Sequence, residues 1–284
     1  MRILVTGAMG MLGTDVVAEC LRRGHKVIAL GRAELDITSG SAVKEALKVH
    51  HPEVVINCAA YTNVDGAEEN RNLAMAVNAL GVRNLALACR AVDAALVHMS
   101  TDYVFDGSKS GPCRIYDHRN PINAYGESKY LGECFIETVG GRYFIVRTSW
   151  LFGHKGPNFV ETMLRLAQAG QSMTVVTDQR GCPTYTVDLA AALLDLIETQ
   201  AYAIYHITNR GATTWYEFAK AIFDFTGLKV NLSPTDSNQY KRPARRPANS
   251  VLDPFPLEET IGYLLPPWQE ALKRYLALKG YQTA

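Results

Sequence analysis

The sequence predicts an α/β protein: a Rossmann-type, doubly wound parallel sheet with a smaller C-terminal α/β lobe that binds substrate. Short runs of Val, Ile and Leu alternate with longer stretches of helical spacing through the first half of the chain, as in parallel sheets with crossover helices. A glycine-rich turn lies between the first apolar run and the first helical stretch. The length of 284 residues leaves room for two unequal lobes.

The expected strands are short and apolar, as is typical of parallel strands covered on both faces. They are Arg2–Thr6, Lys26–Leu30, Val54–Asn57, Leu96–Met99 and Tyr143–Arg147. Helical spacing between them occurs in Met11–Arg23, in Ser39–His50, twice within Ala67–Val92, and in Tyr125–Val139. Right-handed crossovers would place the carboxyl ends of all strands at one edge, where ligands bind.

Beyond residue 150 the pattern is less regular. The expected elements are helices Asn158–Ala169, Val187–Thr199, Trp215–Phe225 and Trp268–Leu278, and a strand Ile204–Ile207. Thr214 is the expected N-cap of the third of these helices, with Glu217 completing a capping box. The stretch 231–256 is rich in Pro, Ser, Asn and Arg and should be mostly loop. We therefore expect a nucleotide-binding domain at 1–150 and a mainly substrate-binding lobe at 151–284, with further crossings between them allowed.

The composition excludes several classes of protein. Hydrophobic residues make up 48% and charged residues 20%, which indicates a folded chain. A net charge of +1 gives no bulk attraction to nucleic acid or an anionic membrane. Six scattered cysteines, no leader pattern and no apolar run of about 18 residues predict a cytoplasmic protein. The spacing of the seven histidines predicts no metal site.

Three glycines form the pattern T-G-x-x-G-x-x-G after the first strand: Gly7, Gly10 and Gly13. In such a turn one glycine permits the tight bend, one lets the backbone approach a pyrophosphate, and one lets helix and strand pack closely. The free N–H groups and dipole of the helix N-terminus favour the anion. No Gly-Lys-Ser/Thr follows, which excludes a P-loop. The turn therefore predicts a bound dinucleotide.

The end of the second strand bears on which dinucleotide is used. A carboxylate there accepts the adenosine ribose hydroxyls of NAD, whereas a nearby arginine accommodates the 2′-phosphate of NADP. This chain has Gly31 followed by Arg32, and Glu34 lies further into the loop. We therefore expect NADPH to be preferred, with NADH as the other candidate cofactor.

Tyr125 and Lys129 are four residues apart, which places both side chains on one face of a helix. A nearby ammonium lowers the pKa of a phenol, which can then donate a proton to a carbonyl oxygen as hydride arrives at the carbon. Thr101 follows the fourth strand, where its hydroxyl can bond the same substrate oxygen. These three residues are the expected catalytic group.

Other polar residues have simpler interpretations. Asp65, Glu68 and Glu69 are interpreted as the acidic first turn of a helix, which suits the helix dipole. His98 is interpreted as a core residue with satisfied hydrogen bonds.

On these residues the chain is identified as a member of the short-chain dehydrogenase/reductase superfamily of the extended type. Four further stretches resemble the dTDP-4-dehydrorhamnose reductase family, and the resemblance runs along nearly the whole chain. They are Asn57–Asp65, the run S-T-D-Y-V-F-D-G at 100–107, Arg147–Trp150, and R-P-x-N-S at 246–250.

The resemblance implies reduction of the C4 ketone of dTDP-4-dehydro-L-rhamnose to dTDP-L-rhamnose by a nicotinamide hydride. In this implied reaction Tyr125 donates the proton, Lys129 lowers its pKa, and Thr101 orients the ketone. With the residues above, the expected cofactor-binding set is Gly7, Gly10, Met11, Leu12, Gly13, Arg32, Asp36, Ile37, Ala60, Tyr61, Thr62, Met99, Tyr125 and Lys129. The expected substrate-binding set is Thr101, Asp102, Tyr125, Trp150 and Arg246.

Two alternatives stay open. The same Tyr–Lys pair would serve another sugar-nucleotide reductase or an epimerase, because the fold does not fix the substrate. A non-catalytic regulatory subunit, like that of methionine adenosyltransferase, also resembles this family, although the intact Thr101, Tyr125 and Lys129 favour catalysis. The expected partner is a dTDP-sugar, with no nucleic acid or membrane. The sequence leaves open whether the chain forms a homodimer.

Overall fold

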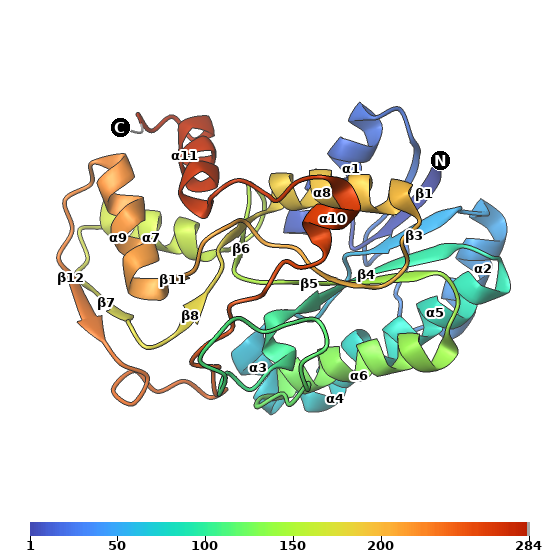
Figure 1. Ribbon diagram of the computed structural model, residues 1–284, viewed down its shortest axis with the longest axis horizontal. Helices are drawn as coiled ribbons and strands as arrows, with labels where there is room; N and C mark the ends of the chain where they lie inside the picture. Colours follow the sequence, from blue (N-terminus) through green and yellow to red (C-terminus); the bar gives the residue numbers. More distant parts are fainter. Residues whose placement is uncertain (283–284) are drawn as a thin grey trace.

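The computed structural model describes residues 1–282 and contains a six-stranded parallel sheet between two layers of helices (Figure 1). The strand order is β10-β5-β4-β3-β1-β2, which confirms the expected Rossmann-type sheet. The strands are β1 (Arg2–Thr6), β2 (Lys26–Leu30), β3 (Val54–Asn57), β4 (Ala95–Thr101), β5 (Tyr143–Thr148) and β10 (Ile204–His206).

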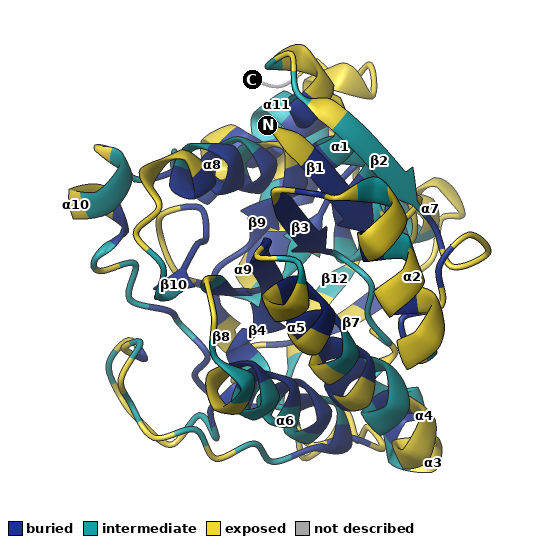
Figure 2. Cartoon of the chain, turned by 90° about the vertical axis from the view of Figure 1, so that its right-hand side faces the viewer, coloured by how far each residue is buried: buried dark blue, intermediate teal, exposed yellow. Residues whose placement is uncertain are grey.

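Helices cover both faces of this sheet (Figure 1). One layer consists of α1 (Met11–Arg22), α8 (Thr186–Thr199) and α10 (Leu257–Ile261). The other consists of α2 (Gly40–His50), α3 (Val64–Glu69), α4 (Arg71–Met75), α5 (Val82–Ala91) and α6 (Ala124–Val139). Figure 2 shows β3 and most of β1 as buried and the edge strand β2 as intermediate, whereas the outer faces of α2 and α5 are exposed.

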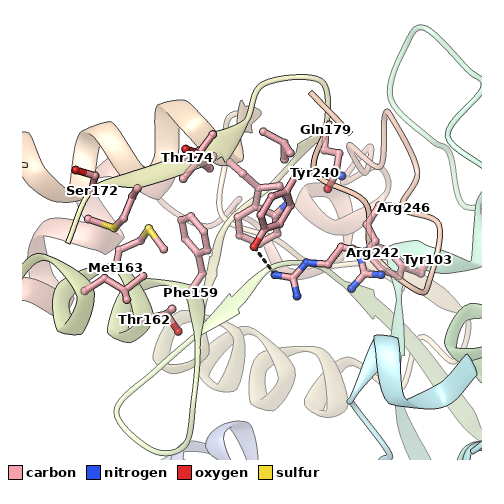
Figure 3. A pocket seen from close by; sticks show the side chains of 15 residues that line it. Tyr103, Phe159, Thr162, Met163, Ser172, Thr174, Gln179, Tyr240, Arg242 and Arg246 are labelled. Carbon is pink, nitrogen blue, oxygen red and sulfur yellow. Dashed lines mark hydrogen bonds between the residues drawn. The ribbon is translucent and has the colours of Figure 1, made fainter. Parts of the chain in front are cut away.

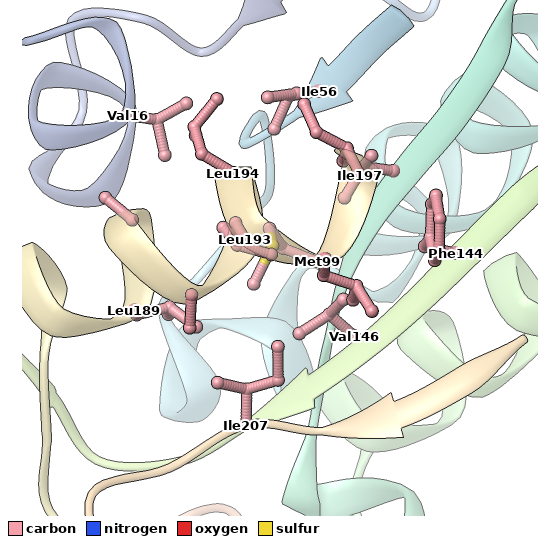
Figure 4. Close-up of a cluster of buried hydrophobic side chains, with 14 of the residues drawn as sticks. Val16, Ile56, Met99, Phe144, Val146, Leu189, Leu193, Leu194, Ile197 and Ile207 are labelled. Atoms are coloured by element: carbon pink, nitrogen blue, oxygen red, sulfur yellow. The ribbon is translucent and has the colours of Figure 1, made fainter. Parts of the chain in front are cut away.

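Successive side chains along each strand point to opposite faces of the sheet and contribute to two separate hydrophobic cores. In β1, Ile3 and Val5 pack toward α1 and α8, whereas Leu4 packs toward α2 and α5. Figure 4 shows Leu193 of α8 among the sheet residues of the first core, which include Val146. Burial on both faces explains why these strands read as continuous apolar runs rather than as alternating ones.

The second lobe packs helices around short strand pairs and an aromatic core. Its helices are α7 (Phe159–Gln168), α9 (Trp215–Thr226) and α11 (Trp268–Leu278). Its strands are β6 (Leu151–Phe152), β7 (Met173–Val176), β8 (Arg180–Gly181), β9 (Thr184–Tyr185), β11 (Thr213–Thr214) and β12 (Leu232–Thr235). The Thr214 hydroxyl accepts the N–H of Glu217 at 3.2 Å, as the predicted cap requires.

The expectation of a mostly irregular stretch at 231–256 missed β12. This strand pairs in parallel with β7 although it contains Pro234, which is tolerated because the pair has no third strand on that side. The two-residue strands were also missed, since they are too short to carry a periodic signal. After residue 150, α8, β10 and α10 return to the large sheet, so the chain crosses between lobes more than once. The division at residue 150 itself stays a prediction.

The helical run 71–91 joins α4, a π-helical segment at Ala76–Gly81, and α5. Among the helices within residues 1–282, this run is the one that is long and apolar enough to cross a membrane. Half of its most apolar 18-residue window is buried inside the structure. A core helix of a soluble protein meets the same criteria, so this feature is weak evidence for a membrane span.

Candidate active site

The turn between β1 and α1 has a backbone that requires glycine. Gly7 has a φ of +62°, and a Cβ on it would lie 2.6 Å from the Ala59 nitrogen. A Cβ on Gly13 would lie 2.2 Å from the Gly7 oxygen. Gly10 caps α1 without a side chain, so the first N–H groups of this helix stay free beside the cavity that residues 10–13 line. The turn is a backbone cradle that fits a pyrophosphate.

A first cavity of about 320 Å³ lies at the carboxyl ends of β1, β2 and β3. Arg32 lines it and is exposed to solvent. Asp36 lines it too, and hydrogen bonds from Thr38 lower the pKa of its carboxyl. The other expected cofactor residues on its wall are Gly7, Gly10, Ile37, Ala60 and Tyr61.

A chain of buried polar groups fixes the strand ends behind this cavity. The Thr6 hydroxyl donates to Asn57 Oδ1 at 2.6 Å, and the Ala59 N–H donates to the same oxygen at 3.2 Å. Asn57 Nδ2 lies 3.0 Å from His98 Nδ1. His98 is buried as expected, but its Nε2 has no hydrogen-bond partner within residues 1–282, and burial holds its pKa well below the usual value. The interpretation of His98 as fully satisfied was therefore wrong.

A second cavity of about 570 Å³ continues from the first along the sheet edge, and the two share Met9, Gly10, Cys58 and Ala60. It brings together the expected catalytic residues Thr101, Tyr125 and Lys129. Its wall also holds Met11, Leu12, Gly13, Thr62, Met99, Asp102 and Trp150. With Arg246, described below, every expected cofactor- and substrate-binding residue therefore lines a cavity.

Tyr125 and Lys129 lie in the first turns of α6, whose N-cap Asn123 accepts the Gly126 N–H at 2.8 Å. The Lys129 ammonium is buried and donates to the Met99 carbonyl at 2.5 Å; burial lowers its pKa to about 8. Burial raises the pKa of Tyr125 to about 12, against the lowering effect of a hydrogen bond with Thr101. The pKa of Tyr125 therefore lies above its ordinary value instead of below it as expected, because burial is the largest effect on this hydroxyl.

Thr101 and Asp102 face this cavity from the end of β4. The Thr101 hydroxyl donates to Asp102 Oδ1 at 3.0 Å and accepts the Tyr103 N–H at 3.1 Å. Burial raises the pKa of Asp102 to about 7. The cavity therefore holds a carboxyl group that changes charge near neutral pH.

A buried ion pair anchors α6 beneath the cavity. Arg147 of β5 binds Glu133 of α6 with two hydrogen bonds of 2.9 and 2.7 Å, and the two side chains are 1% and 0% exposed. Glu133 also accepts from Ser100 at 2.5 Å and from Arg119 at 2.9 Å. The charge of Arg147 keeps the pKa of Glu133 low despite burial. Sequence reasoning missed Glu133, although its position four residues after Lys129 puts it on the same helix face.

Asn78 is a second residue that sequence reasoning missed. It lies in the π-helical segment and is fully buried. Its side chain bonds both the N–H and the carbonyl of Tyr61, at 2.8 and 3.0 Å, and the Ser128 hydroxyl at 2.9 Å. One amide therefore ties the segment after β3 to the residue beside Lys129.

A third cavity of about 610 Å³ opens in the second lobe (Figure 3) and shares Tyr103 and Trp215 with the second. Arg242 and Arg246 reach it from the loop after β12. Arg242 donates to Tyr240 Oη at 3.1 Å and lies over that ring at 4.9 Å from its centroid. Lys241 and Arg245 of the same basic stretch do not line it.

Asp65 holds this basic loop against α3. Its Oδ1 accepts from Arg246 Nη1 at 2.6 Å and from the Ala244 N–H at 3.2 Å, and Arg242 Nη1 lies 3.6 Å from its Oδ2. Hydrogen bonds and charge from Arg246 lower the pKa of the Asp65 carboxyl against the effect of burial. The interpretation of Asp65 as only part of an acidic first turn was incomplete, because its partners come from a loop far away in the sequence.

Trp150 lines the second cavity beside Trp215, which the second and third cavities share. It has a φ of +48° and stacks on Trp215, with ring centroids 3.5 Å apart and an angle of 7° between the planes. A Cβ on Gly181 would lie 2.4 Å from Trp150 Cε2. The indole therefore has one face covered by Trp215 while its residue lines the second cavity.

Groups of three or more His, Cys, Asp or Glu side chains that could hold a metal ion do not occur in the described part of the chain.

Comparison with known proteins gives consistent matches. The family described as "RmlD substrate binding domain" matches residues 1–280. A dTDP-4-dehydrorhamnose reductase of Streptomyces griseus is 49% identical over 259 residues, 89% of this chain and 85% of the relative. The crystal structure of a dTDP-4-dehydrorhamnose reductase from Clostridium acetobutylicum is 44% identical, with a TM-score of 0.96 over 99% of this chain and 100% of that one. The structure of the Bacillus anthracis reductase in complex with NADP is 41% identical, with a TM-score of 0.95 over 98% and 99%.

Proposed function

The chain belongs to the dTDP-4-dehydrorhamnose reductase family, and from this premise we propose that the residues along its three cavities perform the reaction of that family. The protein is an NADPH-dependent oxidoreductase that reduces the C4 ketone of dTDP-4-dehydro-L-rhamnose to the alcohol of dTDP-L-rhamnose. The observation that carries the proposed residue roles is the meeting of Thr101, Tyr125 and Lys129 in one cavity beside the glycine cradle.

The first two cavities fit a dinucleotide. The free N–H groups at the start of α1 would hold its pyrophosphate, and the cavity lined by Arg32, Asp36 and Ile37 would hold its adenosine. When bound, NADPH supplies the hydride. The Lys129 ammonium lies in the second cavity with protons to donate beyond the one that Met99 accepts, and would hydrogen-bond the nicotinamide ribose.

Tyr125 is the proposed proton donor. Its raised pKa, about 12, keeps the hydroxyl protonated at neutral pH, the state that a donor needs. As hydride adds to C4, the Tyr125 proton passes to the carbonyl oxygen, which leaves an alcohol and a phenolate. The positive charge of Lys129 stabilises that phenolate until solvent reprotonates it. The Thr101 hydroxyl orients the ketone oxygen.

The third cavity is the proposed site of the dTDP group. Arg246 and Arg242 supply guanidinium groups that suit a diphosphate, and Asp65 holds them in place. Trp150 and Asp102 line the second cavity, where the sugar would lie between the nucleotide and the catalytic residues. The shared residues Tyr103 and Trp215 make this one continuous path.

The cellular setting is part of the proposal. All six cysteines are free thiols, which supports a cytoplasmic location. The net charge of +1 supports a partner that is a small sugar nucleotide rather than nucleic acid or a membrane. A homodimer is one candidate assembly and a monomer the other, and light scattering of the purified chain distinguishes the two.

The experiment that tests the function follows the loss of reduced-nicotinamide absorbance with dTDP-4-dehydro-L-rhamnose and NADPH. Tyr125→Phe should lower kcat by roughly 10²–10⁴-fold while leaving NADPH binding intact. Tyr130→Phe, on the same helix but outside the cavities, should retain full activity. Unimpaired turnover by Tyr125→Phe would refute its role as proton donor.

The same assay separates the alternatives. An epimerase would convert its sugar without net loss of NADPH, and a regulatory subunit would show no turnover. Loss of one NADPH per alcohol formed, with dTDP-L-rhamnose identified as the product, supports the reductase.

A further inference from the structure

The end of β2 lacks the acidic side chain that often contacts an adenosine ribose, because Gly31 occupies that place. The structure supplies a carboxylate from elsewhere. The Gly31 N–H donates to Glu34 Oε2 at 2.9 Å, so the Glu34 side chain folds back from the loop onto the strand end.

This carboxylate lies next to the place that a side chain at position 31 would occupy. A Cβ built on Gly31 would lie only 2.8 Å from Glu34 Oε2 and 3.0 Å from Met9 Cγ. Met9 and Gly31 both line the first cavity, and Met9 lines the second as well. Glu34 Oε2 therefore lies at the end of β2, beside two residues that line the first cavity and next to the place where a side chain at position 31 would begin.

An opposing charge lies beside it. Arg32 lines the first cavity, and its positive charge contributes to the lowered pKa of Asp36 on the same wall. A carboxylate accepts hydrogen bonds from ribose hydroxyls and repels a 2′-phosphate, whereas a guanidinium does the reverse. While Glu34 accepts the Gly31 N–H, a phosphate has no access to that donor.

We propose that Glu34 is a specificity-determining residue that binds the adenosine ribose hydroxyls of NADH and opposes the 2′-phosphate of NADPH. The inference rests on the proposed cofactor site. Arg32 and Glu34 then have opposite effects on cofactor choice, so the enzyme accepts both cofactors. The balance of the two charges sets the ratio of Kd for NADH to Kd for NADPH.

The test measures Kd for NADPH and NADH by nicotinamide fluorescence, without sugar substrate. Glu34→Gln keeps an acceptor for the Gly31 N–H but removes the charge. We expect Kd for NADH to rise about tenfold, the effect of losing a charge-assisted hydrogen bond, and Kd for NADPH to fall. The matched control is Glu45→Gln, an exposed site on α2, which removes one negative charge away from the cavity and should leave the ratio unchanged.

A second set of variants in the same binding test moves the carboxylate from position 34 to position 31. Glu34→Ala should weaken NADH binding. The double variant Gly31→Asp, Glu34→Ala should restore it, because the new aspartate supplies a carboxylate directly at the end of β2. Arg32→Ala should weaken NADPH binding instead.

Either of two results would overturn the inference: a Kd ratio in Glu34→Gln equal to that of Glu45→Gln, or a double variant that binds NADH as weakly as Glu34→Ala. Failure of the proposed reaction is a separate outcome, since these titrations need neither the sugar substrate nor turnover.

Discussion

The buried pair of Arg147 and Glu133 gives a prediction whose size follows from the structure. Arg147→Met fills the space of the arginine but leaves Glu133 without the two charged hydrogen bonds from Arg147, of 2.9 and 2.7 Å. Breaking a buried pair in this way costs about 3–5 kcal/mol. We expect the lower value, about 3 kcal/mol, because Arg119 and Ser100 still bond the Glu133 carboxylate.

Thermal unfolding measures this cost directly. For a chain of 284 residues the entropy of unfolding is about 0.6 kcal/mol/K, so about 3 kcal/mol lowers Tm by about 5 °C. The double variant Arg147→Met, Glu133→Leu should recover most of this loss, since it buries no unpaired charge.

The pH dependence adds a second check with a defined sign. The folded-state pKa of Glu133 is lowered in the native protein, so the pair stabilises the fold above the unfolded pKa of about 4, and this contribution is lost as pH falls through the lower folded-state value. The difference in Tm between Arg147→Met and the native protein should therefore be full at pH 7 and shrink below pH 4. A Tm unchanged at pH 7, or a difference as large in acid as at pH 7, would refute the reasoning.

Three other predictions concern the cavities. Gly13→Ala places a methyl group 2.2 Å from the Gly7 oxygen and should weaken NADPH binding by roughly 10- to 100-fold in a fluorescence titration, whereas Gly111→Ala, which meets no atom within 4 Å, should not. Asp65→Asn should raise KM for the dTDP-sugar about tenfold with little change in kcat, because the arginine loop loses its anchor; equal KM values for Asp65→Asn and the native enzyme would contradict this. Asp102 has a folded-state pKa of about 7 against about 4 unfolded, so its burial destabilises the fold progressively as pH rises from about 4 to 7. Asp102→Asn should gain Tm relative to the native protein over that interval, and a difference independent of pH would count against the buried carboxyl.

The sequence predicts the parts of this molecule whose signals are local. The apolar strand runs, the T-G-x-x-G-x-x-G turn and the four-residue spacing of Tyr125 and Lys129 each depend on neighbouring residues, and each leads to the observed element. β12 was missed because Pro234 and its polar neighbours lack a strand pattern.

The contacts that position the site depend on distant residues and could not be inferred in this way. Asp65 and Arg246 are 181 positions apart, and nothing in either neighbourhood indicates the pairing. The sequence places Glu34 further into the loop after Arg32, but the hydrogen bond from the Gly31 N–H to its carboxylate depends on the conformation of that loop. Burial also depends on residues that are distant in the sequence. The pKa of Tyr125 is raised because the folded chain buries its hydroxyl, and the composition of the chain does not indicate this.

The π-helical segment at Ala76–Gly81 sets the rotational phase of everything that follows it in the helix. A π turn holds one residue more than an α turn, so it offsets later side chains around the axis by about 100°. With this offset Asn78 faces Tyr61 while Val82 and Leu85 of α5 still face the sheet core. A regular α-helix with all of these residues retained would rotate the apolar face of α5 out of the core, whereas deleting one residue would keep α5 in phase but would lose the placement of Asn78 beside Tyr61. The wide turn therefore accommodates one extra residue in a helix that looks ordinary in the sequence, and this places a buried amide against the segment after β3.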